Sequence, residues 1–321
     1  MHDMQVRIRQ VDLTNATWYH GSRYSYPLRS EDTGEAFALV DILKRQGTEP
    51  PPHVHHREHE IFVCLDTPVD FQASGSTFAA KPGAVAFLPS GIPHRFGIRQ
   101  TWGRLLVIAV PGGFERYLAP FSVPATHLDT PPPAGDLDVP GLIARGPDFG
   151  IEFVPPDAEL AAFPSHQPEG LAPIVREYSE GETLDVLGVT VRVKVSATES
   201  AGALSFFMTE DPPRVGPPLH VHHREDETFY AVEGEYAVQV GDRMSTLRQG
   251  QCAFLPRGVP HTYANAGAST GKLLVLTTPG GFDGFFREVD ALSRATAPTP
   301  ENVAPIGARY GLEIVGPPIF A

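Results

Sequence analysis

Histidine and glutamate residues near the start of the chain have the spacing of a metal site. His53 and His55 are separated by one residue, Glu60 follows shortly after, and His94 lies downstream of a Pro- and Gly-containing turn. Successive residues of a β-strand face opposite sides, so His53 and His55 would point the same way and reach one ion. Three imidazoles and one carboxylate suit Fe, Mn, Co, Ni, Cu or Zn. Four protein ligands also leave coordination positions open for catalysis.

The second half of the chain repeats this set of side chains. His220, His222, Glu227 and His261 have the same relative spacing as the first four residues. A lone histidine in a strand is more often structural or solvated than a ligand. Because the whole set occurs twice, the sequence favours two metal sites, each holding one divalent transition metal.

Four ionisable residues beside these ligands are not predicted to be ligands themselves. His56 and His223 fall on the opposite strand face by alternation and are not expected to bind the ion. Glu58 and Glu225 are predicted to be turn or surface carboxylates, with support of a ligand histidine as the alternative.

The repetition extends along most of the chain and defines its organisation. Residues 86–89 (AFLP) recur at 253–256, and residues 111–114 (PGGF) recur at 279–282. The chain is therefore a tandem duplication, with a linker marked by four prolines between positions 155 and 168. We expect an N-terminal domain of residues 1–156 and a C-terminal domain of residues 157–321.

The segments between the turns are short, apolar and rich in β-forming residues. Residues 37–43, 60–65, 85–88 and 105–110 are of this kind, and the chain contains 31 glycines and 33 prolines to punctuate them. This pattern is typical of an all-β sandwich or barrel. Helical spacing after each PGGF, as in residues 282–289, predicts short peripheral helices. The predicted fold class is all-β, with two tandem barrels and short helices around them.

The composition excludes several classes of function. The chain has 38 acidic and 25 basic residues, a net charge of −13 and no Lys/Arg cluster, so nucleic acids and anionic membranes are not expected as partners. No apolar run is long enough to span a membrane, and the first residues lack the apolar core of a signal peptide. Cys64 and Cys252 give no disulfide framework, so the predicted location is cytoplasmic.

The two halves resemble cupin domains. The C-terminal half carries the residues of both cupin motifs, namely His220, His222, Glu227 and Gly234, then Gly250, Pro256, Gly258, His261 and Asn265. The N-terminal half departs from them at Thr67, where glycine is usual, and at Ile98, where asparagine is usual. The resemblance implies a double-stranded β-helix, or jelly roll, for each domain. It also implies that the turn after Glu60 and the rim of the first pocket differ from their counterparts.

Among cupins, the chain is most similar to bicupins of the quercetin 2,3-dioxygenase type. The resemblance rests on HVHHRE after a proline pair in both halves, on the two PGGF segments, and on Trp18, Tyr19 and Gly21 followed by residues 31–34 (EDTG). It implies a dioxygenase that binds a flavonol-like or other aromatic or enolic substrate through a deprotonated hydroxyl and cleaves it with O2, releasing carbon monoxide. Iron is one of the candidate metals. Glu60 or Glu227 would be both ligand and proton acceptor.

Strand alternation also predicts which residues line the pockets. It selects Phe62, Cys64, Phe96 and Ile98 in the first domain, and Phe229, Ala231, Tyr263 and Asn265 in the second. Of these, substrate contacts are assigned to Phe62, Phe96, Ile98, Phe229, Tyr263 and Asn265, with ordinary barrel core as an equal alternative. The N-terminal set is the more apolar and favours that domain for the main chemistry. Tyr263 and Asn265 would offer polar contacts in the other.

The sequence is also compatible with other functions. An oxalate decarboxylase has two such sites but needs an arginine beside its small dianionic substrate, and Arg95 faces outward by alternation. A metal-dependent isomerase or cyclase of natural-product metabolism would use the same ligands as a Lewis-acid site. A non-enzymatic metal-binding cupin is the third alternative, but storage cupins commonly lose ligands and all eight are present here. The expected partners are an aromatic small molecule and O2, with a homodimer through exposed barrel edges left open.

Overall fold

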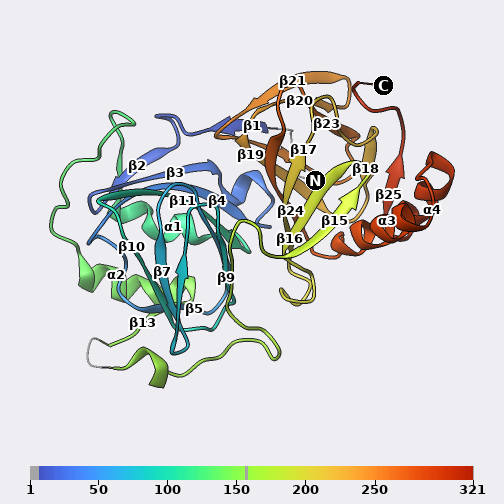
Figure 1. The fold of residues 1–321 in the computed structure, drawn as a ribbon. Coiled ribbons are helices and arrows are strands. Elements are labelled where there is room, and N and C mark those ends of the chain that lie inside the picture. Colours follow the sequence, from blue (N-terminus) through green and yellow to red (C-terminus); the bar gives the residue numbers. More distant parts are fainter. Residues whose placement is uncertain (1–6, 156–157, 321) are drawn as a thin grey trace. The chain divides into compact units, whose positions relative to one another are not determined.

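The computed structural model describes residues 7–155 and 158–320, which form two β-rich units (Figure 1). One unit comprises residues 11–179, and the other comprises the strand β1 (Arg7–Gln10) together with residues from 180 onward. The predicted boundary between positions 156 and 157 lies outside the described residues. The division nevertheless differs from the predicted one, because each unit contains a strand that the repeat pattern assigned to the other domain.

Edge pairing explains this difference. Strand β1 pairs antiparallel with β22 (Gln251–Leu255) in the C-terminal unit. Strand β14 (Ile174–Arg176) pairs antiparallel with β9 (Val85–Leu88) in the N-terminal unit. Each added strand satisfies backbone groups at an otherwise open sheet edge. An internal repeat gives no information about such pairing.

The N-terminal unit consists of two antiparallel sheets. The larger sheet has the strand order β12-β2-β3-β4-β11-β6-β9-β14, and the smaller has the order β13-β5-β10-β7-β8. The remaining strands of this unit are β2 (Ala16–Tyr19), β3 (Ser22–Leu28), β4 (Ala38–Arg45), β5 (His53–His55), β6 (His59–Cys64), β7 (Val69–Ala73), β8 (Ser76–Ala80), β10 (His94–Ile98), β11 (Trp102–Val110), β12 (Val123–Pro124) and β13 (Ile151–Phe153).

The C-terminal unit repeats this arrangement. Its larger sheet has the order β1-β22-β19-β24-β17-β16-β15, and its smaller sheet has the order β21-β20-β23-β18-β25. Its other strands are β15 (Glu182–Val186), β16 (Val189–Val195), β17 (Ser205–Asp211), β18 (His220–His222), β19 (Asp226–Glu233), β20 (Glu235–Val240), β21 (Arg243–Arg248), β23 (His261–Asn265), β24 (Gly271–Thr278) and β25 (Leu312–Ile314).

Short helices lie outside the sheets, which confirms that part of the predicted fold class. The longest is α3 (Asp283–Ala295), in the segment where helical spacing followed the second PGGF. The others are α1 (Phe114–Leu118), α2 (Val139–Arg145) and α4 (Pro300–Arg309), with single 3₁₀ turns η1 (Ser30–Asp32), η2 (Ala119–Phe121), η3 (Gly146–Phe149) and η4 (Leu160–Ala162).

Each unit has its own hydrophobic core between its two sheets. Alternate residues of β6 and β10, including Phe62, Cys64, Phe96 and Ile98, belong to the N-terminal core. Strand alternation therefore predicted the inward faces correctly. The ligand residues come at the start of these inward faces. They are therefore buried at one end of each core.

The turn after the glutamate differs between the units, as the sequence predicted. In the C-terminal unit, Gly234 alone separates β19 from β20, and its φ of +96° is a conformation that L side chains rarely adopt. In the N-terminal unit, residues 65–68 separate β6 from β7. Thr67 is fully buried there and packs against Gly103, where a Cβ would lie 2.1 Å from its methyl group.

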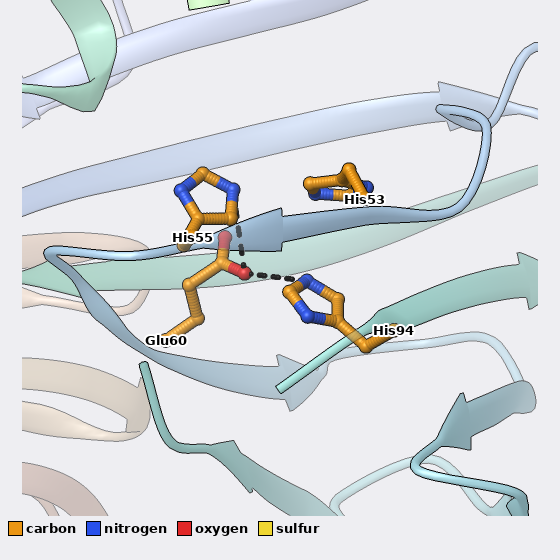
Figure 2. Close-up of side chains that lie close together, drawn as sticks. All are labelled: His53, His55, Glu60 and His94. Carbon is orange, nitrogen blue, oxygen red and sulfur yellow. Dashed lines mark ion pairs between the residues drawn. The ribbon is translucent and has the colours of Figure 1, made fainter. Parts of the chain in front are cut away.

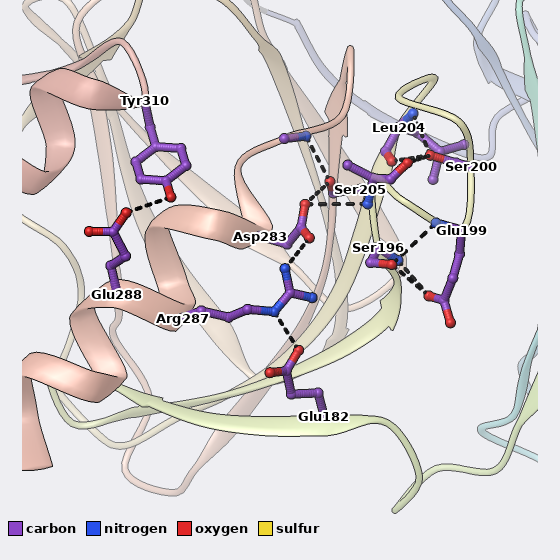
Figure 3. Close-up of polar contacts among 12 residues, drawn as sticks. Glu182, Ser196, Glu199, Ser200, Leu204, Ser205, Asp283, Arg287, Glu288 and Tyr310 are labelled. Atoms are coloured by element: carbon purple, nitrogen blue, oxygen red, sulfur yellow. Dashed lines mark hydrogen bonds and ion pairs between the residues drawn. The ribbon is translucent and has the colours of Figure 1, made fainter.

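The first residue of α3 fixes the start of that helix (Figure 3). The buried carboxylate of Asp283 accepts hydrogen bonds from Ser205 Oγ at 2.7 Å and from the backbone N–H of Ala197 at 3.3 Å. It also pairs with Arg287 one turn later at 2.5 Å. These contacts tie the helix to the barrel and thereby position Phe282, the residue before it.

Candidate metal centres

Three strands bring the predicted ligands of the N-terminal unit together (Figure 2). His53 and His55 lie on β5, Glu60 on β6, and His94 starts β10, directly opposite His53 in the antiparallel register. One nitrogen or oxygen atom of each lies within 4.8 Å of the others, and all four residues are buried. The Oε2 atom of Glu60 is 2.9 Å from Nε2 of His94 and 3.7 Å from Nε2 of His55.

Backbone carbonyls orient two of these rings. His53 Nδ1 donates to the Pro51 carbonyl at 2.9 Å, and His94 Nδ1 donates to the Ile92 carbonyl at 2.8 Å. Because a carbonyl oxygen only accepts, each ring holds its hydrogen on Nδ1 and presents the Nε2 lone pair to the cluster. This is the tautomer that a metal ligand needs.

Glu58 lies in the turn between β5 and β6, as one of the predicted options had it, but it is not a surface residue. Its side chain is buried and Oε2 lies 3.4 Å from Nδ1 of His55, which agrees with the alternative that it supports a ligand histidine. The chain turns back between β5 and β6 so that the carboxylate meets the outer side of the ring. Alternation describes a strand, and the reversal at residues 56–58 lies outside both strands, so it could not place this side chain.

The C-terminal unit repeats the cluster with His220, His222, Glu227 and His261, again buried and within the same 4.8 Å limit. Glu227 Oε2 is 3.0 Å from Nε2 of His261 and 3.9 Å from Nε2 of His222. Nδ1 of His220 and of His261 donates to the carbonyl two residues earlier, at 2.7 and 2.9 Å. Glu225 is buried and lies 3.6 Å from Nδ1 of His222.

The electrostatics of the clusters fit a transition-metal ion. Burial and the neighbouring imidazoles lower the pKa of His53 and of His220 well below the ordinary value, so both rings are neutral. Burial would raise the pKa of Glu60, but His55 and His94 outweigh it and lower the pKa to about 2. Neutral imidazoles and an ionised carboxylate are the forms that bind metal.

Buried polar atoms without hydrogen-bond partners also indicate that the clusters suit a metal ion. Nε2 of His55, Nε2 of His94 and Oε2 of Glu60 have no hydrogen-bond partner, and Nε2 of His222 has none in the other cluster. Buried polar atoms are nearly always satisfied, so such a convergence calls for a ligand. With three nitrogen donors and one oxygen donor, these side chains suit a divalent transition metal.

The histidines next to the ligands point elsewhere, as predicted. His56 Nε2 lies 2.9 Å from Glu152 Oε2, and His223 Nε2 lies 2.9 Å from Glu313 Oε2. Both histidines are exposed. Neither belongs to a cluster.

A cavity opens onto each cluster. The N-terminal cavity has about 630 Å³ of empty space, counting the part open to solvent, and the C-terminal cavity has about 770 Å³. Apart from the ligands, the walls are mainly aromatic and aliphatic. The N-terminal walls include Tyr19, Tyr24, Ile42, Phe62, Phe96, Val107, Phe114, Tyr117 and Phe153, and the C-terminal walls include Val191, Thr209, Phe229, Tyr263, Val275, Phe282, Phe285 and Phe286.

The predicted substrate-contacting residues divide into two groups. Phe62 and Phe96 border the N-terminal cavity, and Phe229 and Tyr263 border the C-terminal one. Within the described residues, the linings do not include Ile98 or Asn265, which lie one strand repeat further from the ligands. Cys64 and Ala231 likewise lie in the cores and outside the linings.

Asn265 has a structural use instead. Its Nδ2 donates to the Asp211 carbonyl at 2.7 Å and to the Ser269 carbonyl at 2.8 Å, and its Oδ1 accepts from the Gly267 N–H at 2.8 Å. The side chain therefore joins the end of β17 to the turn after β23. Ile98, its counterpart, cannot make these bonds.

Two phenylalanines at the cavities were not among the predicted site residues. The Phe114 ring meets the His55 ring edge-on at a centroid distance of 5.3 Å, and Phe282 meets His222 in the same way at 4.4 Å. Each is the last residue of a PGGF segment and immediately precedes or begins a helix. The PGGF segment occurs in both halves, and this repetition is the sequence signal that could have identified them.

Comparison with known proteins agrees with this architecture. Residues 41–110 and 206–277 match the model of the cupin domain, and each match contains all four ligand residues of one cluster and part of its cavity wall. The protein contains two cupin domains. Their ligand clusters, one in each domain, are metal-binding His/Glu sites.

Two known proteins are similar to this bicupin in sequence. It is 25% identical to quercetin 2,3-dioxygenase of Bacillus subtilis (strain 168) over 260 residues, which is 79% of this chain and 77% of the relative. It is 33% identical to protein SchB of Streptomyces halstedii over 89 residues, covering 27% of this chain and 64% of that protein.

Solved structures with the same fold include oxalate decarboxylases. The enzyme from Bacillus subtilis at pH 4.6 matches with a TM-score of 0.55 and 16% identity over 85% of this chain and 76% of that chain. The formate complex from Lactobacillus farciminis matches with a TM-score of 0.56 and 16% identity over 92% and 95%. These likenesses concern the fold. Among the described residues, no helix has the length and apolarity needed to cross a membrane.

Proposed function

We propose that this bicupin is a mononuclear metal-dependent dioxygenase of the quercetin 2,3-dioxygenase type, which cleaves a flavonol-like or other aromatic or enolic substrate with O2. The observation that carries the proposal is the union, in each domain, of a four-ligand cluster with an aromatic-walled cavity. The sequence relationship to a quercetin 2,3-dioxygenase supports it.

The cavity walls favour a flat apolar substrate over a small dianion. Apart from the ligand residues, the described linings contain no charged side chain. A dianion would find no lysine or arginine in the wall to pair with the charge that the metal leaves uncompensated, and its desolvation there would be costly. Aromatic walls instead offer offset and edge-on packing to a substrate ring.

A divalent transition metal held by His53, His55, Glu60 and His94 would supply Lewis acidity and redox chemistry with O2. His53 and His94 cannot take a proton from a substrate hydroxyl, because each holds its Nδ1 hydrogen against a carbonyl and would bind the metal through Nε2. Nδ1 of His55 faces Glu58 and is not presented to a substrate. The Glu60 carboxylate has lone pairs to spare and is ionised at neutral pH. It is therefore the group in the cavity that can accept the hydroxyl proton, and Glu227 has the same place in the other domain.

The test combines metal analysis with an oxygen electrode and a panel of flavonols that includes quercetin. The expected result is stoichiometric metal, O2 uptake that depends on both metal and flavonol, and release of carbon monoxide. Glu60→Gln and Glu227→Gln, singly and together, should identify the domain that turns over. Glu152→Gln, on the exposed His56 pair, serves as the matched control and should behave like the parent protein.

Two outcomes would contradict the proposal. Conversion of an enolic substrate without O2 uptake would assign the same ligands to an isomerase or cyclase. Metal-loaded protein that neither consumes O2 nor converts any member of the panel would favour a non-enzymatic metal-binding cupin.

A further inference from the structure

The two barrels contain oppositely charged residues at one equivalent buried position, outside the described cavity linings. Lys44 on β4 lies opposite Gly103 of β11, and Asp211 on β17 lies opposite Gly271 of β24. Both side chains are completely buried. Each follows, by two residues on the same strand, a residue that lines the cavity. The internal repeat has therefore placed a base in one domain where the other domain has an acid.

In the N-terminal domain, the lysine acts on a tyrosine of the cavity wall. Lys44 Nζ donates to Tyr24 Oη at 3.3 Å and lies 5.5 Å from the centroid of the same ring. Because Tyr24 accepts this bond, its own O–H hydrogen stays available to donate. Among the described residues, no acceptor takes that hydrogen. Tyr24 borders the cavity that contains the ligands.

In the C-terminal domain, the acid has the opposite effect. Asp211 Oδ1 accepts the O–H of Tyr263 at 3.0 Å, and its Oδ2 accepts the O–H of Thr209 at 2.7 Å. Tyr263 and Thr209 both border the C-terminal cavity. Their hydroxyl hydrogens are therefore turned toward the buried carboxylate and away from a ligand. Tyr236, also bound to Asp211 at 2.9 Å, completes the network.

We infer that Tyr24, positioned by Lys44, is an oxyanion-recognising residue of the N-terminal cavity, and that the C-terminal cavity lacks this function. The inference rests on the proposed function and deepens it, because it assigns the enolate or phenolate form of the substrate to one of the two sites. Hydrogen bonds between a donor and an ionised acceptor are about twice as strong as neutral ones. A buried cation behind the donor increases this preference in a low-dielectric site.

The buried groups have the protonation properties that this assignment needs. Burial lowers the pKa of Lys44 to about 7, with Glu49 opposing the shift, so the ammonium form is accessible near neutrality. Burial, and after it the charges of nearby tyrosines, Glu49 and Glu60, raises the pKa of Tyr24 well above its usual range. Tyr24 therefore stays a phenol and a donor. A bound anion would in turn favour the charged form of Lys44.

The experiment measures binding without turnover, using metal-loaded protein under anaerobic conditions. The probes are quercetin and 4-nitrocatechol, whose absorption spectra report ionisation of the bound hydroxyl. Tyr24→Phe and Lys44→Met should each weaken binding of the anion about tenfold to hundredfold, as expected for a hydrogen bond to a charged group. The matched variant Tyr26→Phe removes the hydroxyl of another buried tyrosine on β3, outside the described cavity linings, and should change binding less than about twofold.

Two further readouts separate recognition from a merely structural role. In Tyr24→Phe, the apparent pKa of the bound probe's hydroxyl should rise, because the donor that stabilised its anion is gone. In the double variant with Lys44→Met, the losses should be less than additive, because Lys44 acts through Tyr24. Metal content and thermal unfolding of each variant establish that the fold and the ligands are intact.

The outcomes also separate this inference from the proposed function. Weaker 4-nitrocatechol binding in both N-terminal variants supports the inference even if quercetin causes no O2 uptake. Equal losses in Tyr24→Phe and Tyr26→Phe would overturn it. So would a parent protein that binds neither anion, or N-terminal variants that bind both probes like the parent.

Discussion

The Oε2 atom of Glu58 lies 3.4 Å from Nδ1 of His55, so this ligand histidine has a buried carboxylate behind it. His53 and His94 have neutral carbonyls in the same place. Burial would lower the pKa of His55, but Glu60 and then Glu58 outweigh it and raise the pKa. A carboxylate behind a ligand histidine fixes the ring and makes it a stronger donor to the metal.

Glu58→Gln should therefore weaken metal binding at the N-terminal site about tenfold to hundredfold, the usual effect of removing such a partner. Competition with a coloured chelator measures the affinity. Glu225→Gln should weaken the C-terminal site to a similar extent, because Glu225 lies 3.6 Å from His222 Nδ1. Glu152→Gln, which alters an exposed histidine pair, should leave both sites unchanged. Parent-like metal affinity in Glu58→Gln would show that this carboxylate is only a packing residue.

Metal affinity should rise with pH at the N-terminal site. The raised pKa of His55 means that this ring keeps its proton to a higher pH than a free imidazole does, and the metal must displace that proton. His53 competes little, because burial and the neighbouring imidazoles keep its pKa well below 6.5. Titrating metal into chelator-treated protein at several pH values should show proton release that diminishes as pH rises. Metal affinity independent of pH between 6 and 8 would contradict a protonated His55 in the ion-free cluster.

Removal of the Phe282 ring should destabilise the C-terminal domain. The ring is almost completely buried, contacts His222 and stacks on Phe285 at a centroid distance of 4.9 Å. Phe282→Ala should lower the free energy of unfolding by about 3–5 kcal/mol, and Phe282→Leu by much less. Denaturant unfolding of metal-free protein measures the difference. A loss in Phe282→Ala no larger than that in Phe282→Leu would show that the ring does not hold the cavity wall in place.

The ligand clusters could be predicted from sequence because their information is local and repeated. His53 and His55 share a strand face, and the chain repeats the complete set of ligands in its second half. The inward placement of Phe62 and Phe96 follows from the same alternation. Alternation does not predict how far the cavity extends along a strand. That depth depends on how much of the space is filled by side chains of the opposite sheet and of the helices. Ile98 and Asn265 therefore share the inward face without bordering the cavity.

Contacts between distant segments account for the other differences. Strand β1 pairs with β22 although 241 positions separate Gln10 from Gln251, whose side chains meet at 2.9 Å. Glu58 depends on a chain reversal, and the Lys44–Tyr24 contact depends on the pairing of β3 with β4. The offset that aligns the ligands of the two halves also aligns Lys44 with Asp211. The sequence does not show what these two side chains contact, which depends on the packing of neighbouring strands.

Lys44→Met should stabilise the protein while it weakens anion binding. The pKa of Lys44 is about 7 in the folded chain and about 10.4 in an unfolded one, where lysine has its ordinary value. Between these two values the unfolded chain binds more protons, so the contribution of Lys44 to stability improves as pH rises from 7 toward 10. Below pH 7 the folded protein contains a buried ammonium group at its full energetic cost. Replacing such a group by an apolar one of similar size typically stabilises by about 1–4 kcal/mol.

The gain from Lys44→Met should therefore be largest near pH 6 and should shrink by pH 9–10, where the lysine is neutral in the folded state. Thermal or denaturant unfolding across this range, with metal-free protein, measures it. Lys81→Met, at an exposed lysine, should show no such pH dependence. A gain that is constant with pH would mean that Lys44 keeps its proton in the folded protein as it does in the unfolded chain, so that burial does not lower its pKa. Lys44 would then be a permanent cation behind Tyr24, and the preference of the N-terminal cavity for an anion would not change with the titration of Lys44.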